Sequence, residues 1–155
     1  MDADSQLLVR QAGFDDLDSV VPLFDAYRQF YKQASDPVLA RSFLQDRFRN
    51  NESIVFLAFK PNGSALGFTQ LYPSFSSGLA RRIFILNDLF VVPEARRHGV
   101  GGALLQAAAE FGVKSGAVRL ALSTALDNAA AQALYERSGW RRDTVFCTYT
   151  LPLNG

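Results

Sequence analysis

The chain is short and nearly neutral, and these properties exclude several functional classes. It has 155 residues, of which 48% are hydrophobic and 20% charged, with 16 basic side chains against 15 acidic ones. That length fits one folded unit with a single core, so we expect one domain over residues 1–155. A nucleic-acid partner is not expected, because no basic excess is available to neutralise a run of phosphates.

Cysteine and histidine are too scarce for a disulfide or a zinc site. Cys147 is the only cysteine and His98 the only histidine, so no metal is predicted and a reducing, cytoplasmic setting is expected. The opening residues, MDADSQ, lack the basic and apolar pattern of a signal peptide. No apolar run approaches the roughly 18 residues of a membrane span, so no membrane partner is predicted either.

The first part of the chain predicts a strand followed by two helices. The apolar run at residues 7–12 is typical of a strand. From Asp15 to Tyr31, apolar residues recur at three- and four-residue steps, which indicates an amphipathic helix. A second helical pattern begins at Pro37 and runs to Phe48, with Asp36 in position to cap it.

The remaining residues predict three strands and then alternating helices and strands. Residues 53–60 and 65–72 flank the turn sequence Pro-Asn-Gly-Ser and predict an antiparallel hairpin, and residues 81–92 predict a third strand. There follow a helix at about 100–114, a strand at 118–125, a helix at 128–138 and a last strand at 144–151. The predicted order is β-αα-βββ-α-β-α-β, an α+β fold with helices on both faces of a mixed, mostly antiparallel sheet.

A strand that runs into a glycine-rich loop and then a helix is the clearest functional signal. Its residues of interest are Phe90, Val91, Val92, Arg96, Arg97, His98, Gly99, Val100, Gly101 and Gly102. Free backbone N–H groups and the helix dipole make such a loop a socket for phosphate. Leu104 excludes the dinucleotide pattern GxGxxG, and the P-loop sequence is absent. The alternative is a tight turn with glycines for packing and arginines for solubility.

A second motif, NAAAQALYERSGW at residues 128–140, follows the first in the order seen in one known family. The chain resembles the GNAT acetyltransferase superfamily, whose acetyl-coenzyme A loop, Arg/Gln-x-x-Gly-x-Gly/Ala, is met by Arg96, Gly99 and Gly101. The next conserved segment of that family, Asn-x-x-Ala-x-x-Leu-Tyr-x-x-x-Gly-Phe/Trp, is met by Asn128, Ala131, Leu134, Tyr135, Gly139 and Trp140. The resemblance covers residues 54–153, with the N-terminal helices matched by topology only, and it implies the three-layer α/β/α fold of that superfamily.

Within the superfamily, the segment LNDLFVVPEARRHGVG is similar to the branch of histone-and-polyamine and diamine acetyltransferases. The diamine group usually carries a glutamate where this chain has Asn87.

The resemblance implies an acetyl-coenzyme A-dependent N-acetyltransferase, in which an amine attacks the thioester directly within a ternary complex. The backbone of residues 97–102 would hold the pyrophosphate, and an N–H near Val91 the thioester oxygen. Tyr135 would protonate the leaving thiolate, with Asn128 and Ala131 beside the pantetheine. Alternatively, Tyr135 is a core aromatic residue and Asn128 only a helix cap. Cys147, the only candidate for a covalent intermediate, is interpreted as a buried packing residue.

The acceptor amine has to lose a proton, because an alkylamine has a pKa of about 10.4. Asn87, Asp88 and Asp36 are the polar groups expected near it, and strand alternation would place Asn87 and Asp88 on opposite faces. An aromatic acceptor pocket is expected from Tyr27, Tyr31 and Tyr72. Tyr27 and Tyr31 could instead belong to the apolar face by which the helix packs on the core. For Phe30, packing in the core is the preferred interpretation.

These observations favour acetylation of a small primary amine, such as a polyamine, an amino acid or an aminoglycoside-like compound. The same chemistry on a protein lysine or an N-terminal amine is a second hypothesis. A coenzyme A-binding sensor without turnover is a third, against which the presence of Tyr135 and Asn128 argues. Because members of the superfamily are often dimers, a homodimer is expected, and the apolar last strand suits either a subunit boundary or the inside of a sheet.

Overall fold

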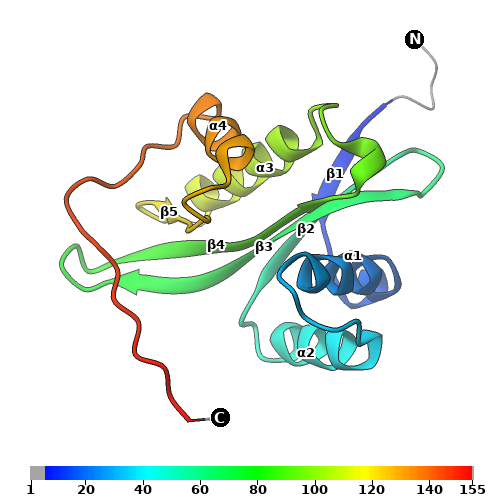
Figure 1. The fold of residues 1–155 in the computed structure, drawn as a ribbon, viewed down its shortest axis with the longest axis horizontal. Coiled ribbons are helices and arrows are strands. Elements are labelled where there is room, and N and C mark those ends of the chain that lie inside the picture. Colours follow the sequence, from blue (N-terminus) through cyan, green and yellow to red (C-terminus); the bar gives the residue numbers. More distant parts are fainter. Residues whose placement is uncertain (1–5, 155) are drawn as a thin grey trace. The chain divides into compact units, whose positions relative to one another are not determined.

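The computed structural model describes residues 6–154, which fall into two compact units (Figure 1). The first unit ends at Ser123, and its described residues contain five strands and three α-helices. The second begins at Thr124 and contains the helix α4 (Ala129–Arg137). Among the residues described, no helix combines the length and the apolar character needed to cross a bilayer.

A mixed sheet lies at the centre of the first unit. Its strands lie side by side in chain order: β1 (Leu8–Gln11), β2 (Ile54–Phe59), β3 (Ala65–Ser76), β4 (Arg81–Val91) and β5 (Leu120–Ala121). Neighbours pair antiparallel from β1 to β4, whereas β5 runs parallel to β4 and pairs with only Phe84 and Ile85. The predicted mixed, mostly antiparallel sheet is confirmed, although its fifth strand is shorter than the predicted 118–125.

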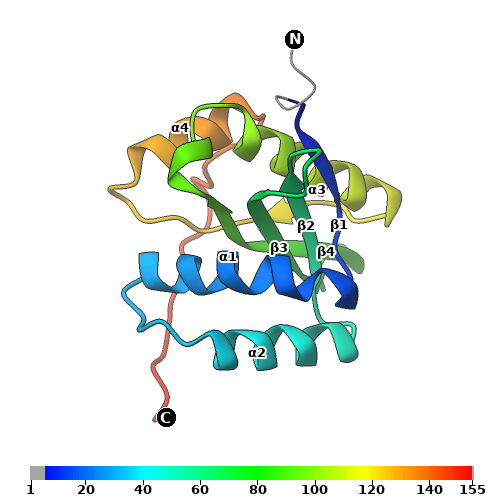
Figure 2. The same ribbon diagram turned by 90° about the vertical axis from the view of Figure 1, so that its right-hand side faces the viewer.

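Helices cover both faces of this sheet, as predicted. On one face lie α1 (Leu17–Phe30) and α2 (Pro37–Arg49), side by side, and on the other lies α3 (Val100–Lys114) (Figure 2). Asp36 caps α2 as expected, because its Oδ1 accepts a hydrogen bond from the Leu39 N–H at 3.0 Å. Pro37 occupies the first helical turn, where its missing N–H removes no helical bond.

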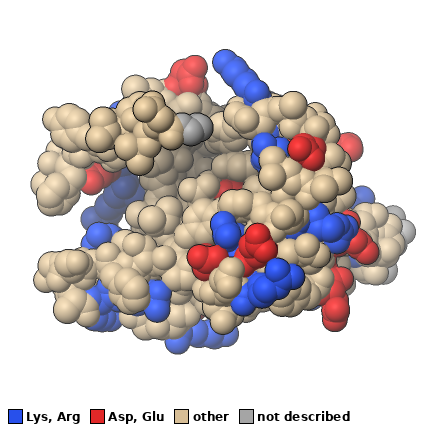
Figure 3. Space-filling view, turned by 90° about the horizontal axis from the view of Figure 1, so that it is seen from below, with Lys and Arg blue, Asp and Glu red and all other residues tan. Residues whose placement is uncertain are grey.

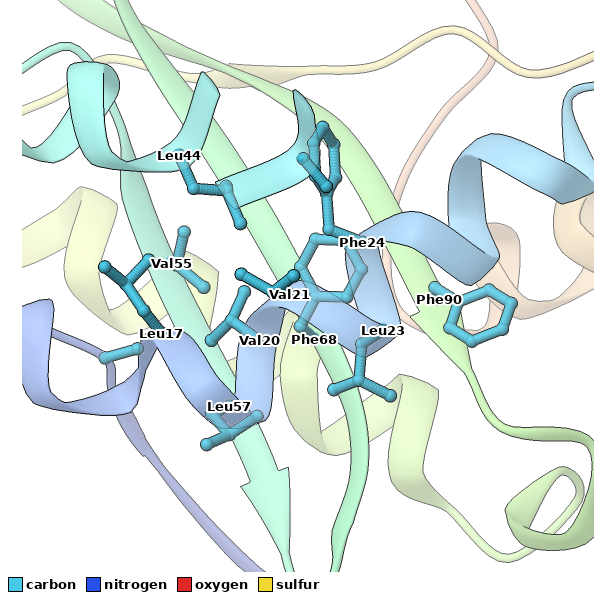
Figure 4. Packing of buried hydrophobic residues seen from close by; sticks show 12 residues of the cluster. Leu17, Val20, Val21, Leu23, Phe24, Leu44, Val55, Leu57, Phe68 and Phe90 are labelled. Atoms are coloured by element: carbon cyan, nitrogen blue, oxygen red, sulfur yellow. The ribbon is translucent and has the colours of Figure 1, made fainter. Parts of the chain in front are cut away.

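The main hydrophobic core lies between the sheet and the helices α1 and α2. The apolar stripe of α1 meets inward-facing residues of the sheet, as Figure 4 shows. Members of this core include Leu17, Val20, Val21, Leu23, Phe24, Leu44, Val55, Leu57, Phe68 and Phe90. Phe24 is the centre of an aromatic cluster, with ring centroids 5.6 Å from Phe43 and 6.3 Å from Phe68. Buried apolar area of this kind is the main source of stability, and it fixes α2 against the sheet.

A β-bulge interrupts the pairing of β3 with β4. Gln70 pairs with Asp88 and Leu71 with Leu86, so Asn87 is an extra residue on β4 without a partner on β3. Such a bulge breaks the strict alternation of side chains along a strand and can redirect them. It therefore changes where the polar pair at positions 87 and 88 points.

The second unit contains one correction to the predicted element order. The predicted helix is present as α4, but residues 141–154 form no strand in the structure, so the expected final strand at 144–151 is absent from the described chain. A strand is stable only when its backbone groups pair with a neighbour, and this segment joins no ladder. Cys147 within it is exposed, so its interpretation as a buried packing residue is wrong.

Candidate active site

The glycine loop, residues 96–102, presents backbone donors at the start of α3. Gly99 is the N-cap of the helix and has a left-handed φ of 81°, a conformation that glycine adopts without strain. The first helical bond of α3 runs from the Ala103 N–H to the Gly99 carbonyl, so the N–H groups of residues 100–102 have no acceptor within the helix. A Cβ added at Gly99 or Gly102 would meet no atom within 4 Å. The backbone is thus open to an approaching anion.

The basic residues of the loop have different roles. Arg96 turns back to β4, where its Nε donates to the Val91 carbonyl at 2.9 Å and its guanidinium lies 5.7 Å from the centre of the Phe90 ring. Arg97 is exposed and has a left-handed φ of 66°. His98 is exposed as well. Arg96 therefore anchors the loop to the strand, while Arg97 and His98 remain at the surface.

The edge of β4 beyond β5 carries a candidate oxyanion donor. The Val92 N–H donates to the Leu66 carbonyl of the β3 side at 2.9 Å. Backbone groups of successive residues point to opposite edges of a strand, so the Val91 N–H points away from β3. On that side, β5 pairs with β4 only at Phe84 and Ile85. The predicted donor at Val91 thus lies on an edge that no described strand of the first unit covers.

Asp88 is a buried carboxylate beside the bulge, with only 1% of its surface exposed. Its Oδ2 accepts a hydrogen bond from Gln70 Nε2 at 2.7 Å, and its Oδ1 accepts one from Asn87 Nδ2 at 2.8 Å. Burial raises the pKa of Asp88 to about 6, against the two hydrogen bonds, which lower it. Gln70 Oε1 is buried without a hydrogen-bond partner among the described residues. The cluster can therefore take up a proton near neutral pH.

The predicted separation of Asn87 and Asp88 onto opposite faces is wrong. Asn87 is exposed and Asp88 is buried, yet their side chains are joined by a hydrogen bond. The bulge explains this, because Asn87 has no partner on β3 and the alternation of the strand is lost there. Asp36, the third expected polar group, is occupied in capping α2.

The tyrosines of α1 differ in environment. Tyr27 is half-buried, its ring centroid lies 6.0 Å from that of Phe68, and its hydroxyl donates to the Asn87 carbonyl at 3.1 Å. Tyr31 lies next to it with ring centroids 4.9 Å apart and is exposed. Tyr27 therefore belongs to the core stripe and also touches the bulge. Phe30 is 59% exposed, so its assignment to the core is wrong, because it lies on the outer side of the last helical turn.

A cleft of about 580 Å³ opens between α2 and the strands β3 and β4. Its lining residues include Phe43, Arg47, Glu52, Tyr72, Phe75 and Arg82. Of these, only Tyr72 is predicted at the acceptor site from the sequence. Burial, reinforced by the charge of Asp88, raises the pKa of the Tyr72 hydroxyl, which therefore remains a proton donor throughout the physiological range.

The residues around the cleft and Asp88 that were not predicted have recognisable spacings in the sequence. Gln70 precedes Tyr72 by two positions, so strand alternation places both on one face. Arg47 follows Phe43 by four positions, so helical spacing also places this pair on one face.

Lys/Arg and Asp/Glu side chains are interspersed on the face that Figure 3 shows, rather than forming a field of one sign.

In the second unit, Asn128 and Tyr135 belong to α4. Asn128 Oδ1 accepts a hydrogen bond from the Ala131 N–H at 3.2 Å, so Asn128 caps the helix as predicted. Tyr135 lies about two helical turns further along, with its ring centroid 6.1 Å from that of Trp140. Gly139 has a left-handed φ of 93° at the end of this helix.

Comparison with known proteins decides the family. The model of the acetyltransferase (GNAT) family matches residues 19–140, which include the glycine loop and α4. The chain belongs to this family. It is similar to the uncharacterized N-acetyltransferase YhfO of Bacillus subtilis (strain 168), with 50% identity over 143 residues, covering 92% of this chain and 95% of that protein.

Solved structures share the fold of this GNAT protein. The crystal structure of a probable acetyltransferase matches it with a TM-score of 0.91 and 45% identity over 96% of this chain and 99% of that one. The aminoglycoside N-acetyltransferase AAC(6')-Iy in complex with CoA matches at a TM-score of 0.80 over 96% of each chain, and its 18% identity indicates a common fold alone.

The family assignment confirms that the protein is an acetyl-transferring enzyme with the predicted α+β fold and that acetyl-coenzyme A is its acetyl donor. The narrower histone, polyamine and diamine branch remains a prediction. The open backbone at Gly99 and Gly102 fits an approaching pyrophosphate. Among residues 6–154, no three potential metal-ligating side chains gather in one place.

Proposed function

We propose that this enzyme transfers the acetyl group of acetyl-coenzyme A to the primary amine of a small molecule by direct attack within a ternary complex. The observation that carries the proposal is the buried Asp88 beside the bulge of β4. The same strand leads to the glycine loop and to the edge at Val91, which no described strand of the first unit covers. The strand β4 thus connects a proton acceptor, an oxyanion donor and a phosphate-binding loop.

In the proposed reaction, the lone pair of the amine attacks the thioester carbonyl carbon, the C–S bond breaks and coenzyme A leaves as a thiolate. The N–H groups of residues 97–102 bind the pyrophosphate, and Arg97 and His98 add donors at the loop surface. The neighbouring residues Phe90 and Val92 border the pantetheine arm. The Val91 N–H donates to the carbonyl oxygen as negative charge develops on it.

The protons of this reaction need an acceptor and a donor. We assign Asp88 as the acceptor of the amine proton, because a carboxylate with a pKa of about 6 is ionised at neutral pH yet is a better base than an exposed aspartate. Asn87 and the tyrosines Tyr27, Tyr31 and Tyr72 border the acceptor in this assignment. The family motif supports Tyr135 as the proton donor to the thiolate, with Asn128 and Ala131 beside the pantetheine.

Two alternatives make different demands on the protein. Acetylation of a protein lysine or N-terminal amine requires turnover with peptides, whereas a sensor binds acetyl-coenzyme A without turnover. The test is thiol release from acetyl-coenzyme A by the purified protein with polyamines, amino acids, aminoglycosides and lysine peptides. Release with one class of small amine supports the proposal. Release with peptides alone, or tight binding without release, contradicts it.

Tyr135→Phe tests the proposed thiolate donor. We expect turnover to fall by about 10- to 1000-fold, because a general acid contributes in that range, with little change in the affinity for acetyl-coenzyme A. Steady-state kinetics and calorimetric titration of coenzyme A measure the two quantities. Unchanged turnover would remove Tyr135 from this role.

A homodimer is also proposed, as is usual in this superfamily. Exposed apolar side chains of the C-terminal segment support it, namely Val145, Phe146, Tyr149, Leu151 and Leu153. Light scattering at several protein concentrations tests the assembly, and a monomeric mass at all of them excludes it.

A further inference from the structure

We infer that the cleft beside α2 binds a carboxylate, so that the acceptor is a small amino acid carrying both a primary amine and a carboxylate group. This inference rests on the proposed function, because it assigns the substrate class of that same site. It depends on the charges in the cleft, on how its arginines are held, and on the position of Tyr72 two residues from Gln70, the partner of Asp88.

The cleft has an excess of positive charge. Arg47 of α2 and Arg82 of β4 line it, against the single carboxylate of Glu52. Two guanidinium groups and one carboxylate give these side chains a net charge of about +1, which one further carboxylate would neutralise. An arginine is the side chain best suited to a carboxylate, because its planar donors can bind both oxygens at once.

The arginines are held in place by aromatic rings. The guanidinium of Arg47 lies 4.7 Å from the centre of the Phe43 ring, and that of Arg82 lies 4.2 Å from the centre of the Phe75 ring. Stacking of this kind restricts a long side chain before any ligand arrives, which lowers the entropy lost on binding. Both cations are thus preorganised at the cleft.

Arg47 also has a buried donor with no hydrogen bond. Its Nε lies 3.2 Å from Glu52 Oε1, but this ion pair lacks hydrogen-bond geometry, and the Nε has no other partner among the described residues. A buried N–H without an acceptor is costly. Glu52 already lies beside this Nε, so a carboxylate bound in the cleft would reach the part of the Arg47 side chain that remains exposed, which is 28%.

Tyr72 connects the cleft with the proposed proton acceptor. It lines the cleft, and it lies two residues along β3 from Gln70, which donates to Asp88. Two residues of a strand span roughly 7 Å, so both groups lie on one face at that spacing. Asp88 itself does not line the cleft, so in this inference the carboxylate of a small amino acid meets Arg47 and Tyr72 while its amine lies on the side of the Gln70–Asp88 pair.

A polycationic acceptor fits this cleft poorly. The second ammonium group of a diamine would face Arg47 and Arg82, and unscreened like charges at a binding site disfavour the wrong ligand strongly. The cleft therefore discriminates among the amines by charge, in favour of the amino acid.

Three acceptors with the same four-carbon chain test the inference: 4-aminobutyrate, butylamine and 1,4-diaminobutane. They present the same primary amine at one end and a carboxylate, a methyl group or an ammonium group at the other. We expect kcat/KM for 4-aminobutyrate to exceed those for the other two by at least about 10-fold, the range of a charged hydrogen bond. A higher kcat/KM for 1,4-diaminobutane or butylamine overturns the inference while leaving the acetyltransferase proposal intact.

Arg47→Gln removes one positive charge from the cleft and keeps a polar side chain that is two atoms shorter than arginine. We expect the preference for 4-aminobutyrate over butylamine, as a ratio of kcat/KM values, to fall by about 10- to 100-fold. Arg49→Gln is the matched control, since Arg49 belongs to the same helix but its side chain is 66% exposed and pairs with Asp46 outside the cleft. Arg82→Gln provides a second test if the Arg47 variant does not fold, as judged by circular dichroism.

A binding measurement separates the two proposals. Calorimetric titration of 4-aminobutyrate into the protein saturated with coenzyme A should show binding that Arg47→Gln weakens and Arg49→Gln does not. If binding depends on Arg47 but no amine is acetylated, the carboxylate site stands and the proposed function fails. Equal binding to wild type and Arg47→Gln, or no binding at all, overturns the carboxylate site.

Discussion

At the scale of single residues, Asp88 is the group whose environment matters most. Burial disfavours its charged form, and two amide donors only partly offset that cost. The carboxylate is thereby held in a state that exchanges a proton near pH 6. Its amide partners orient both oxygens, so the residue has a fixed geometry as well as a shifted pKa.

Asp88→Asn should change the dependence of stability on pH. The pKa of Asp88 is raised from 3.8 to about 6 on folding, so the folded protein binds this proton more tightly than the unfolded chain. Its contribution to stability is therefore fully present below pH 4 and is lost as the pH rises through 6. We expect the unfolding free energy of wild type, relative to Asp88→Asn, to fall by roughly 3 kcal/mol across that range. Urea unfolding at a series of pH values measures it.

The same variant tests the catalytic role of Asp88. In wild type, kcat/KM should rise as the pH is raised through 6. In Asp88→Asn, kcat/KM should be lower by about 100- to 10,000-fold and should no longer rise in this pH range. Asp18→Asn is the control, because that side chain is 90% exposed. If Asp88→Asn keeps both the value of kcat/KM and its rise through pH 6, another group accepts the proton.

At the scale of elements, the close approach of β3 to β4 positions the candidate oxyanion donor. A Cβ added at Gly67 would lie 2.6 Å from the Phe90 carbonyl oxygen and 3.3 Å from the Val91 Cα. These are backbone atoms of β4, so the strand itself would have to move. Gly67 is thus required by the approach of two backbones rather than by an unusual φ.

Gly67→Ala should therefore damage both stability and turnover. We expect a loss of about 1–3 kcal/mol, the usual cost of overpacking, and a lower kcat because the Val91 N–H shifts. Gly78→Ala is the matched control, since a Cβ there meets no atom within 4 Å. Chemical unfolding and steady-state kinetics of both variants test this, and equal stability of the two would contradict the expected clash.

At the scale of the first unit, the core fixes α2 and with it one wall of the cleft. Leu44 is fully buried and connects α2 to the main core, next to Phe43 and three residues before Arg47 (Figure 4). The hydrophobic packing of α2 thus determines where the cleft residues stand. We therefore expect stability and acceptor binding to be coupled through this helix.

Leu44→Ala should reveal that coupling. A buried leucine truncated to alanine costs about 2–5 kcal/mol, and a loosened α2 should raise KM for the acceptor more than KM for acetyl-coenzyme A. Leu39→Ala, on the same helix but 49% exposed, is the control. Thermal unfolding and kinetics measure the effects, and an equal rise of both KM values would argue against a specific link to the cleft.

Local signals in the sequence predicted most of the fold and part of the candidate site. The cap at Asp36, the turn at 61–64 and the start of α3 depend on neighbouring residues only, and the structure has all three. The relation of Asn87 to Asp88 was mispredicted, since a bulge depends on the register of two strands. The exposed Phe30 and Cys147 were misassigned because apolar character alone does not say which neighbour will cover a residue.

The sequence by itself determined the family, the acetyl donor and the order of all but the last element, because these depend on motifs and periodicities that are continuous along the chain. Tertiary structure decided the bulge, the buried contact between Gln70 and Asp88, and the cleft where Arg47 and Arg82 meet Tyr72. These features join residues far apart in sequence. Burial, pKa and charge at a site arise from such contacts, so they follow only from the folded chain.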